Sequence, residues 1–160
     1  REVCERVSGL LHLDALRDAS KEDLDRIKND ILEKDYQKAL YVINENNRVK
    51  QFSVAIKKDD IQTLGVLLYQ SHEGLSTKYK VSCKELDFLV ERAKENPDVL
   101  GARMMGGGFG GCTINLVKKD EFKTFKKEIS KKFKVAFEYD CSVYSVKLSR
   151  GTQIIKNKTI

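Results

Sequence analysis

The sequence predicts an α+β fold: a four-stranded antiparallel sheet with helices on one face, in the split βαβ or ferredoxin-like arrangement. Three features of the chain lead to this class. The part before Pro97 has apolar residues at helical spacing, the part after it has short runs typical of strands, and a lysine-rich helical pattern separates these runs. Because the chain has 160 residues and neither an internal repeat nor a low-complexity linker, we expect one domain over residues 1–160.

Four or five helices are expected in the first part of the chain, and most of them begin at a capping residue. Ser20 and Ser82 each begin a capping-box pattern. Asp35, and either Asp59 or Asp60, can accept hydrogen bonds from the first turn of the helix that follows. The expected helical ranges are 1–13, 20–31, 35–57, 60–75 and 82–96.

Four strands and one helix are expected in the second part of the chain. Cys112, Ile114 and Leu116 alternate with two polar residues, and alternation with period two is typical of a strand with one buried face. Cys112 is therefore expected to begin its strand on the inward face. The expected strands are Val99–Met105, Cys112–Val117, 135–139 and 142–148, and the helix is expected at 119–133.

The net charge of +6 comes mainly from that last helix. Residues 118–134 contain eight lysines and three acidic residues, whereas the rest of the chain is nearly balanced. Phe122, Phe125, Ile129 and Phe133 fall at helical spacing and are expected to face the core, which leaves the lysines on a solvated face. A nucleic-acid site would need aromatic or polar readers among the lysines, so no nucleic-acid partner is expected.

The cysteines and the apolar runs exclude several further classes. Cys4, Cys83, Cys112 and Cys141 form no C-x-x-C pattern, so neither a redox pair nor a metal site is expected. No apolar run approaches the ~18 residues that a membrane span needs, and no signal pattern is visible. Dispersed thiols without such a signal are typical of the cytoplasm. The sequence begins with Arg1 rather than Met, which is typical of a fragment or a processed chain.

Five of the ten glycines fall within residues 106–111, between two expected strands, and are the main candidate for a functional site. Glycine permits positive φ and close approach of the backbone, so the chain must turn sharply here or contact something closely. The run matches neither the P-loop pattern nor G-x-G-x-x-G between a strand and a helix. Three interpretations remain open: an amide nest that contacts phosphate, packing against another glycine-rich loop, and a plain flexible hairpin. The candidate residues are Gly106, Gly107, Gly108, Phe109, Gly110 and Gly111.

Residues 103–112, with the sequence RMMGGGFGGC, resemble the third conserved motif of the GHMP small-molecule kinases. The form GGGFGGC is similar to that of galactokinases in particular. Met105 stands where that family usually has Thr or Ser, and Lys84 stands where it usually has Pro. The resemblance extends over nearly the whole chain, through residues 1–5, 16–18, 45–49, 70–75 and 79–87.

This resemblance implies the C-terminal half of a galactokinase, an enzyme that uses MgATP to phosphorylate α-D-galactose at O1. In that family the catalytic residues, the ATP phosphate loop and the galactose pocket lie mostly in the N-terminal half. We therefore expect no catalytic residue and no metal ligand in this chain. The resemblance implies that residues 106–111 support the phosphate loop of the other half, with Phe109 at the interface. An apolar surface near the glycines, through which the chain could self-associate, is also expected.

Three other functions remain open. A galactokinase-like regulator would bind ligands without catalysis, and a kinase for a related sugar such as N-acetylgalactosamine would differ in its sugar pocket. A free-standing split βαβ module for RNA or small ligands would need exposed aromatic residues on the sheet. Two polar residues are given structural roles: His72 is expected to be a hydrogen-bonded core residue, and Ser71 to bond back into its own helix.

Overall fold

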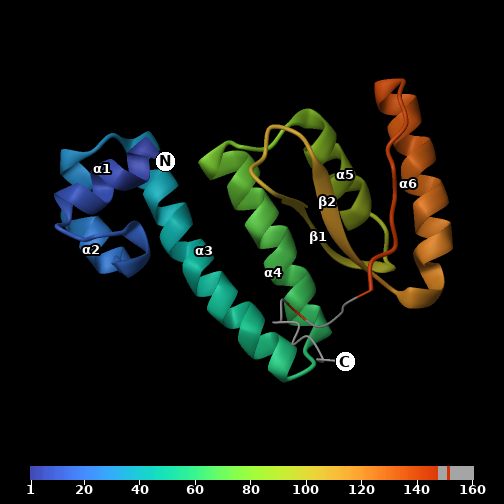
Figure 1. The fold of residues 1–160 in the computed structure, drawn as a ribbon, viewed down its shortest axis with the longest axis horizontal. Helices are drawn as coiled ribbons and strands as arrows, with labels where there is room; N and C mark the ends of the chain where they lie inside the picture. The colour runs from blue at the N-terminus through green and yellow to red at the C-terminus, as the bar shows by residue number, and fades with distance from the viewer. Residues whose placement is uncertain (148–150, 152–160) are drawn as a thin grey trace, which may run out of the picture.

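The computed structural model of this chain describes residues 1–147 and Gly151. Its elements run from a helical N-terminal part to a β-hairpin and a final helix (Figure 1). The helices and strands are α1 (Glu2–Leu10), α2 (Lys21–Arg26), α3 (Glu33–Lys57), α4 (Ile61–Gly74), α5 (Lys84–Lys94), β1 (Val99–Met105), β2 (Cys112–Val117) and α6 (Phe122–Phe137). Short helical turns are η1 (Leu16–Asp18), η2 (Lys28–Asp30), the π-helical η3 (Leu75–Tyr79) and η4 (Lys119–Glu121).

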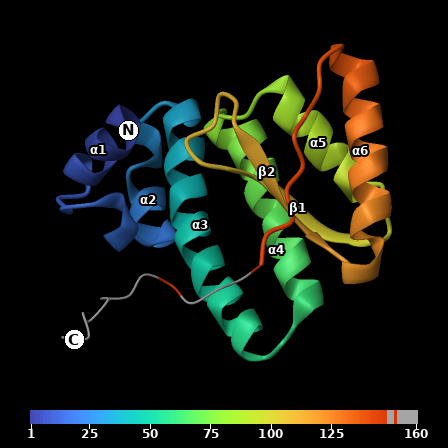
Figure 2. The ribbon, with the colours of Figure 1, turned by 45° about the vertical axis from the view of Figure 1, so that its right-hand side comes forward.

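The long helix α3 and its antiparallel neighbour α4 form the centre of the molecule. Helices α1 and α2 pack around the N-terminal part of α3, and the β-hairpin lies between α4 and α5 (Figures 1 and 2). Helix α6 packs on the outer side of α5. The buried apolar residues accordingly form two clusters, one among α1, α2 and α3, and the other among α5, α6 and the hairpin.

Two of the expected helix caps are confirmed and two are wrong. Ser20 forms a reciprocal capping box with Asp23, and Asp60 accepts a hydrogen bond from the Thr63 amide at 3.0 Å. Asp35 lies inside α3, where its buried carboxylate pairs with Arg6 at 2.5 Å. Ser82 does not cap α5 either: the N-cap residue is Cys83, without a side-chain cap bond, and the buried Ser82 hydroxyl has no hydrogen-bond partner among the described residues.

The two strands have the predicted bounds and pair in antiparallel fashion, with Met105 opposite Cys112 and Met104 opposite Thr113. Ala102 and Met104 are fully buried beneath the helices. The opposite face carries Cys112, which is exposed. The expectation that Cys112 faces inward is therefore wrong, because the alternation in β2 places the polar partners of Ala102 and Met104 on the covered face.

The expected four-stranded sheet is also wrong: within the described residues the sheet has two strands. Residues 135–137 continue α6, because Phe137 lies one turn after Phe133 and both rings pack on Phe88. The apolar alternation at residues 135–139 thus belongs to a helix, which ends where Glu138 adopts φ of 66°.

The last expected strand, residues 142–148, is described only as far as residue 147. Those residues are not assigned to a strand, and the segment runs back from the end of α6 in the direction opposite to that helix (Figures 1 and 2). Val143 packs against the second cluster, whereas Tyr144 and Val146 are exposed. Leu148 lies outside the described residues. The fold class α+β holds, with a two-stranded hairpin in place of the full sheet.

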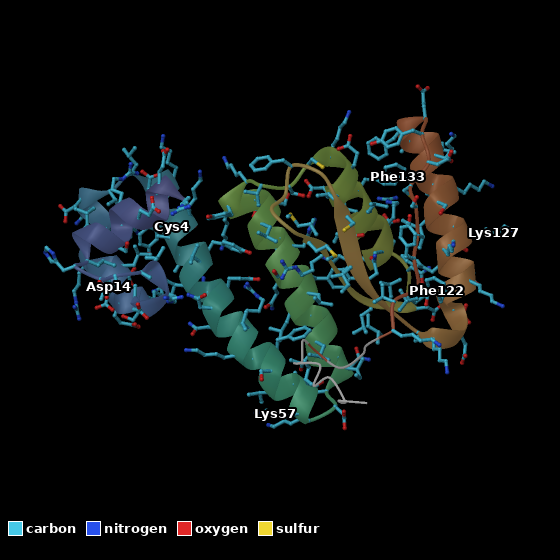
Figure 3. The ribbon with its side chains drawn as sticks, viewed as in Figure 1. Cys4, Asp14, Lys57, Phe122, Lys127 and Phe133 are labelled. Carbon is cyan, nitrogen blue, oxygen red and sulfur yellow. The ribbon has the colours of Figure 1, made fainter. Side chains whose placement is uncertain are left out.

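The lysine-rich helix follows the prediction for its faces. Phe125, Ile129 and Phe133 are buried, and Phe122 is partly buried. Figure 3 shows Phe133 on the side of α6 that faces α5, and Lys127 pointing away from the molecule. The excess positive charge therefore lies on a solvated helix face. In the part of the chain that the structure describes, no helix is long and apolar enough to cross a membrane.

Candidate functional site

Strands β1 and β2 are joined by the six residues 106–111, which form the glycine hairpin. Four of its five glycines have positive φ, and Phe109 itself has φ of 60°. Left-handed backbone is rare for residues with a Cβ atom, so the shape of this hairpin depends on its glycines. The predicted sharp turn is confirmed.

The hairpin makes a close contact with Val81, which lies in the connection between η3 and α5. The Phe109 amide donates a hydrogen bond to the Val81 carbonyl at 2.7 Å. A Cβ atom placed on Gly108 would lie 2.1 Å from that carbonyl oxygen and 2.9 Å from the Val81 Cβ. A close backbone approach expected for this loop is therefore present within the chain, and its partner is the turn at Val81.

Gly107 differs from Gly108 in its backbone φ and in the space around it. It does not have positive φ, and a Cβ atom placed on it would meet nothing within 4 Å. One side of the hairpin is thus packed on the chain and the other is open. The open side is where a partner could approach the loop backbone.

A buried histidine holds the base of the hairpin. The Met104 amide donates to His72 Nδ1 at 3.2 Å, and His72 Nε2 lies 3.1 Å from Asp87 Oδ1. Ser76 donates a further hydrogen bond to Asp87 at 3.0 Å. Burial is the main cause that lowers the pKa of His72, although Asp87 opposes it. The expected core histidine is confirmed: it is neutral, it accepts at Nδ1, and it joins α4, α5 and β1.

This arrangement predicts a loss of stability in mild acid. The pKa of His72 is lower in the folded chain than its ordinary value of 6.5, so the unfolded chain binds the extra proton first. The stabilising contribution is present above about pH 6.5 and is lost as the pH falls from there through the folded pKa. Urea unfolding at pH 7.5 and 5.5 should show this loss in the wild type and a smaller one in His72→Gln. Equal pH dependence in the two proteins would contradict the neutral histidine.

A second polar cluster lies on α3, beside β1, and centres on Glu45. Its carboxylate accepts a hydrogen bond from Ser71 at 2.5 Å, pairs with Arg48, and lies 3.6 Å from Arg103. The expectation that Ser71 bonds back into its own helix is therefore wrong, because a carboxylate on the neighbouring helix is in reach. Burial, followed by the charge of Glu45, raises the pKa of Tyr41 to about 12. Sequence reasoning missed this cluster; the i,i+3 spacing of Glu45 and Arg48 was its only local signal.

The hairpin also presents apolar side chains to solvent. Phe109 is 77% exposed, and Met105 and Ile114 are about half exposed. These three residues lie on the hairpin tip and on the strand face that the helices leave open. Within the described residues, no group of three His, Cys, Asp or Glu side chains could hold a metal ion. The hairpin therefore presents backbone amides and an apolar tip to a partner.

Comparison with known proteins places this geometry in a family. Residues 52–135 match the family described as GHMP kinases C terminal. The chain is 40% identical to a galactokinase of Thermotoga petrophila over 97% of the chain and 43% of that relative. It is 43% identical to a galactokinase of Lactobacillus helveticus over 77% of the chain and 32% of that relative.

A solved structure agrees with these relatives. The fold is similar to that of Lactococcus lactis galactokinase complexed with galactose, with a TM-score of 0.82 and 36% identity over 90% of this chain and 37% of the other. This chain thus spans less than half the length of the relatives that it matches. The hairpin with its glycines at positions 106–111 falls within the matched region, and the chain belongs to the GHMP kinase family, in the part that forms the C-terminal region of those kinases.

Proposed function

We propose that this chain is the C-terminal half of a galactokinase, which transfers the γ-phosphoryl group of ATP to O1 of α-D-galactose. The observation that carries the proposal is the glycine hairpin: one side is packed on Val81, and the other is open at Gly107 and Phe109. Galactokinases from several bacteria share about 40% of their residues with the chain that contains it. Domain 1–160 would then act only together with an N-terminal half.

The role proposed for the hairpin is support of the nucleotide phosphate loop in the other half. Phosphoryl transfer depends mainly on positioning and on electrostatic stabilisation of the transferring group, so a rigid neighbour of the phosphate loop affects the rate without contacting the γ-phosphate. Gly107 lets a second backbone approach the hairpin, because no side chain stands there. Phe109 fits an interface because a ring that is 77% exposed is unfavourable in water and would be buried against a partner.

ATP and Mg²⁺ are assigned to the N-terminal half. Mg²⁺ is held by one or two carboxylates together with phosphates and water, and this chain covers only 43% of a galactokinase relative, so the rest of the protein would supply these ligands. The cation would neutralise charge on the phosphates. The residues of this chain would hold the shape of the adjoining loop and exclude water at the interface. The cytoplasm is the proposed location, since the four cysteines are free thiols and free thiols are typical of a reducing compartment.

The test compares the chain alone with the chain joined to an N-terminal galactokinase half. We expect the isolated chain to fold and to give no turnover of galactose with MgATP, and the joined protein to give it. Assays with N-acetylgalactosamine and other hexoses separate galactokinase from a related sugar kinase. Turnover by the chain alone would contradict the division of roles, and a joined protein that binds galactose without any turnover would indicate a regulator.

A further inference from the structure

The turn that receives the hairpin has an unusual backbone. Helix α4 passes into the π-helical turn η3, which ends at Lys80 with φ of 59° and ψ of 49°. The Val81 amide donates to the Leu75 carbonyl at 3.0 Å and closes the turn. A lysine in left-handed backbone is uncommon, and such strain persists only where the surroundings fix it.

The left-handed residue determines where the next carbonyl points. Val81 follows Lys80 directly, and its carbonyl accepts the Phe109 amide at 2.7 Å. The same carbonyl lies against Gly108, so closely that no Cβ atom fits between them. Two residues with positive φ, Lys80 and Phe109, thus stand on the two sides of a single contact.

Tyr79, the last residue of η3 and the one before Lys80, is held from the opposite side. The Tyr79 ring lies 5.4 Å from the Tyr41 ring of α3, and its hydroxyl lies 3.9 Å from Cys4 Sγ of α1. The Tyr41 ring packs directly on Gly74, because a Cβ atom on Gly74 would lie 2.4 Å from that ring. Helices α3 and α1 therefore hold the residue before Lys80, and the hairpin contacts the residue after it.

We propose that Lys80 is a positioning residue for the glycine hairpin, acting through its left-handed backbone and not through its charge. Its conformation turns the Val81 carbonyl onto the Phe109 amide and so sets the position of the hairpin. Its side chain is exposed, and its ammonium makes no hydrogen bond or ion pair with any described residue. The consequence for the reaction rests on the proposed function, in which the hairpin supports the nucleotide phosphate loop.

The test uses three variants of the full-length enzyme: Lys80→Asn, Lys80→Ala and Lys80→Val. All three remove the ammonium group, but they differ in tolerance of left-handed backbone: asparagine accepts it readily, alanine less well, and a β-branched residue least. Hydrogen exchange of the Phe109 amide reports the contact with Val81 directly. Steady-state kinetics with ATP and galactose varied separately report the effect on each substrate.

We expect the Phe109 amide to exchange at the wild-type rate in Lys80→Asn and about tenfold faster in Lys80→Val, with Lys80→Ala between them. The kcat/KM for ATP should fall in the same order, while the KM for galactose stays unchanged. If Lys80→Val does not fold, the asparagine and alanine variants still provide the comparison. Equal loss of ATP use in all three variants would overturn the proposal in favour of the ammonium charge, and wild-type exchange in Lys80→Val would overturn it outright. A wild-type enzyme that lacks sugar kinase activity would refute the proposed function while leaving the exchange result intact.

Discussion

Replacing Gly108 with valine should lower the kcat/KM for ATP by about 100-fold in the joined enzyme, because misplacement of reacting groups by about 1 Å has an effect of that size. Gly108 has φ of 88°, where a valine costs at least ~1–2 kcal/mol in backbone strain. The added Cβ would also lie 2.1 Å from the Val81 carbonyl oxygen, so the hairpin must move away from its turn. The KM for galactose should change little.

The structure predicts a larger loss of stability for Gly108→Val than the sequence does. The sequence suggests a modest loss in the isolated chain, because a hairpin tip lies at the edge of a fold. The contact with Val81 makes the clash internal to the chain, so overpacking of about 1–3 kcal/mol adds to the backbone strain. Urea unfolding of the isolated chain carrying Gly108→Val measures the sum.

Gly107→Val is the matched variant that separates the two explanations. It adds the same side chain one residue away, where φ is not positive and nothing lies within 4 Å. The isolated chain should therefore unfold as the wild type does, while the joined enzyme should lose ATP use if the hairpin meets the other half. Wild-type ATP kinetics in both variants would mean that the loop is a structural hairpin without a role at the nucleotide.

The elements that the sequence predicted correctly are those set by local chemistry. The bounds of β1 and β2 follow from a run of glycines between two apolar segments, and Ser20 and Asp60 cap their helices through bonds that span three residues. The errors come from long-range contacts. Residues 135–137 have a pattern compatible with a strand, but the Phe88 ring on α5 selects the helix. When an apolar pattern is compatible with both the helical and the strand period, the element that packs against it selects the structure, and the sequence does not show that element.

The same division applies to the candidate site. Glycines at 106–111 predicted positive φ or a close approach, and the structure has both. The identity of the approached residue, Val81, could not be predicted, because it depends on a left-handed lysine that no local signal marks. His72 was recognised by its place on an apolar helix face, whereas the partners Asp87 and Met104 come from elements 15 and 32 residues away.

Gly65→Ala should be the most destabilising single methyl addition in the helical part of the chain. Gly65 lies on α4 where that helix crosses β1, and an added Cβ would stand 1.9 Å from the Leu100 carbonyl oxygen. Gly101, on the strand, faces the same point: its Cβ would lie 2.5 Å from the Gly65 Cα. Two glycines thus let the backbones of a helix and a strand touch, and neither backbone can move aside as a flexible side chain could.

The expected loss of stability in Gly65→Ala arises because α4 and β1 must move apart. Moving α4 away from β1 stretches the hydrogen bonds from Tyr69 to the Val99 carbonyl, 3.3 Å, and from Met104 to His72, 3.2 Å. We expect a loss of about 3 kcal/mol or more in the free energy of unfolding, at the upper end of overpacking effects. Gly9→Ala is the matched control: Gly9 is helical and exposed with nothing within 4 Å, so alanine should stabilise the chain by about 0.5–1 kcal/mol. Urea unfolding measures both variants, and a Gly65→Ala protein within about 1 kcal/mol of the wild type would show that α4 and β1 are not in backbone contact.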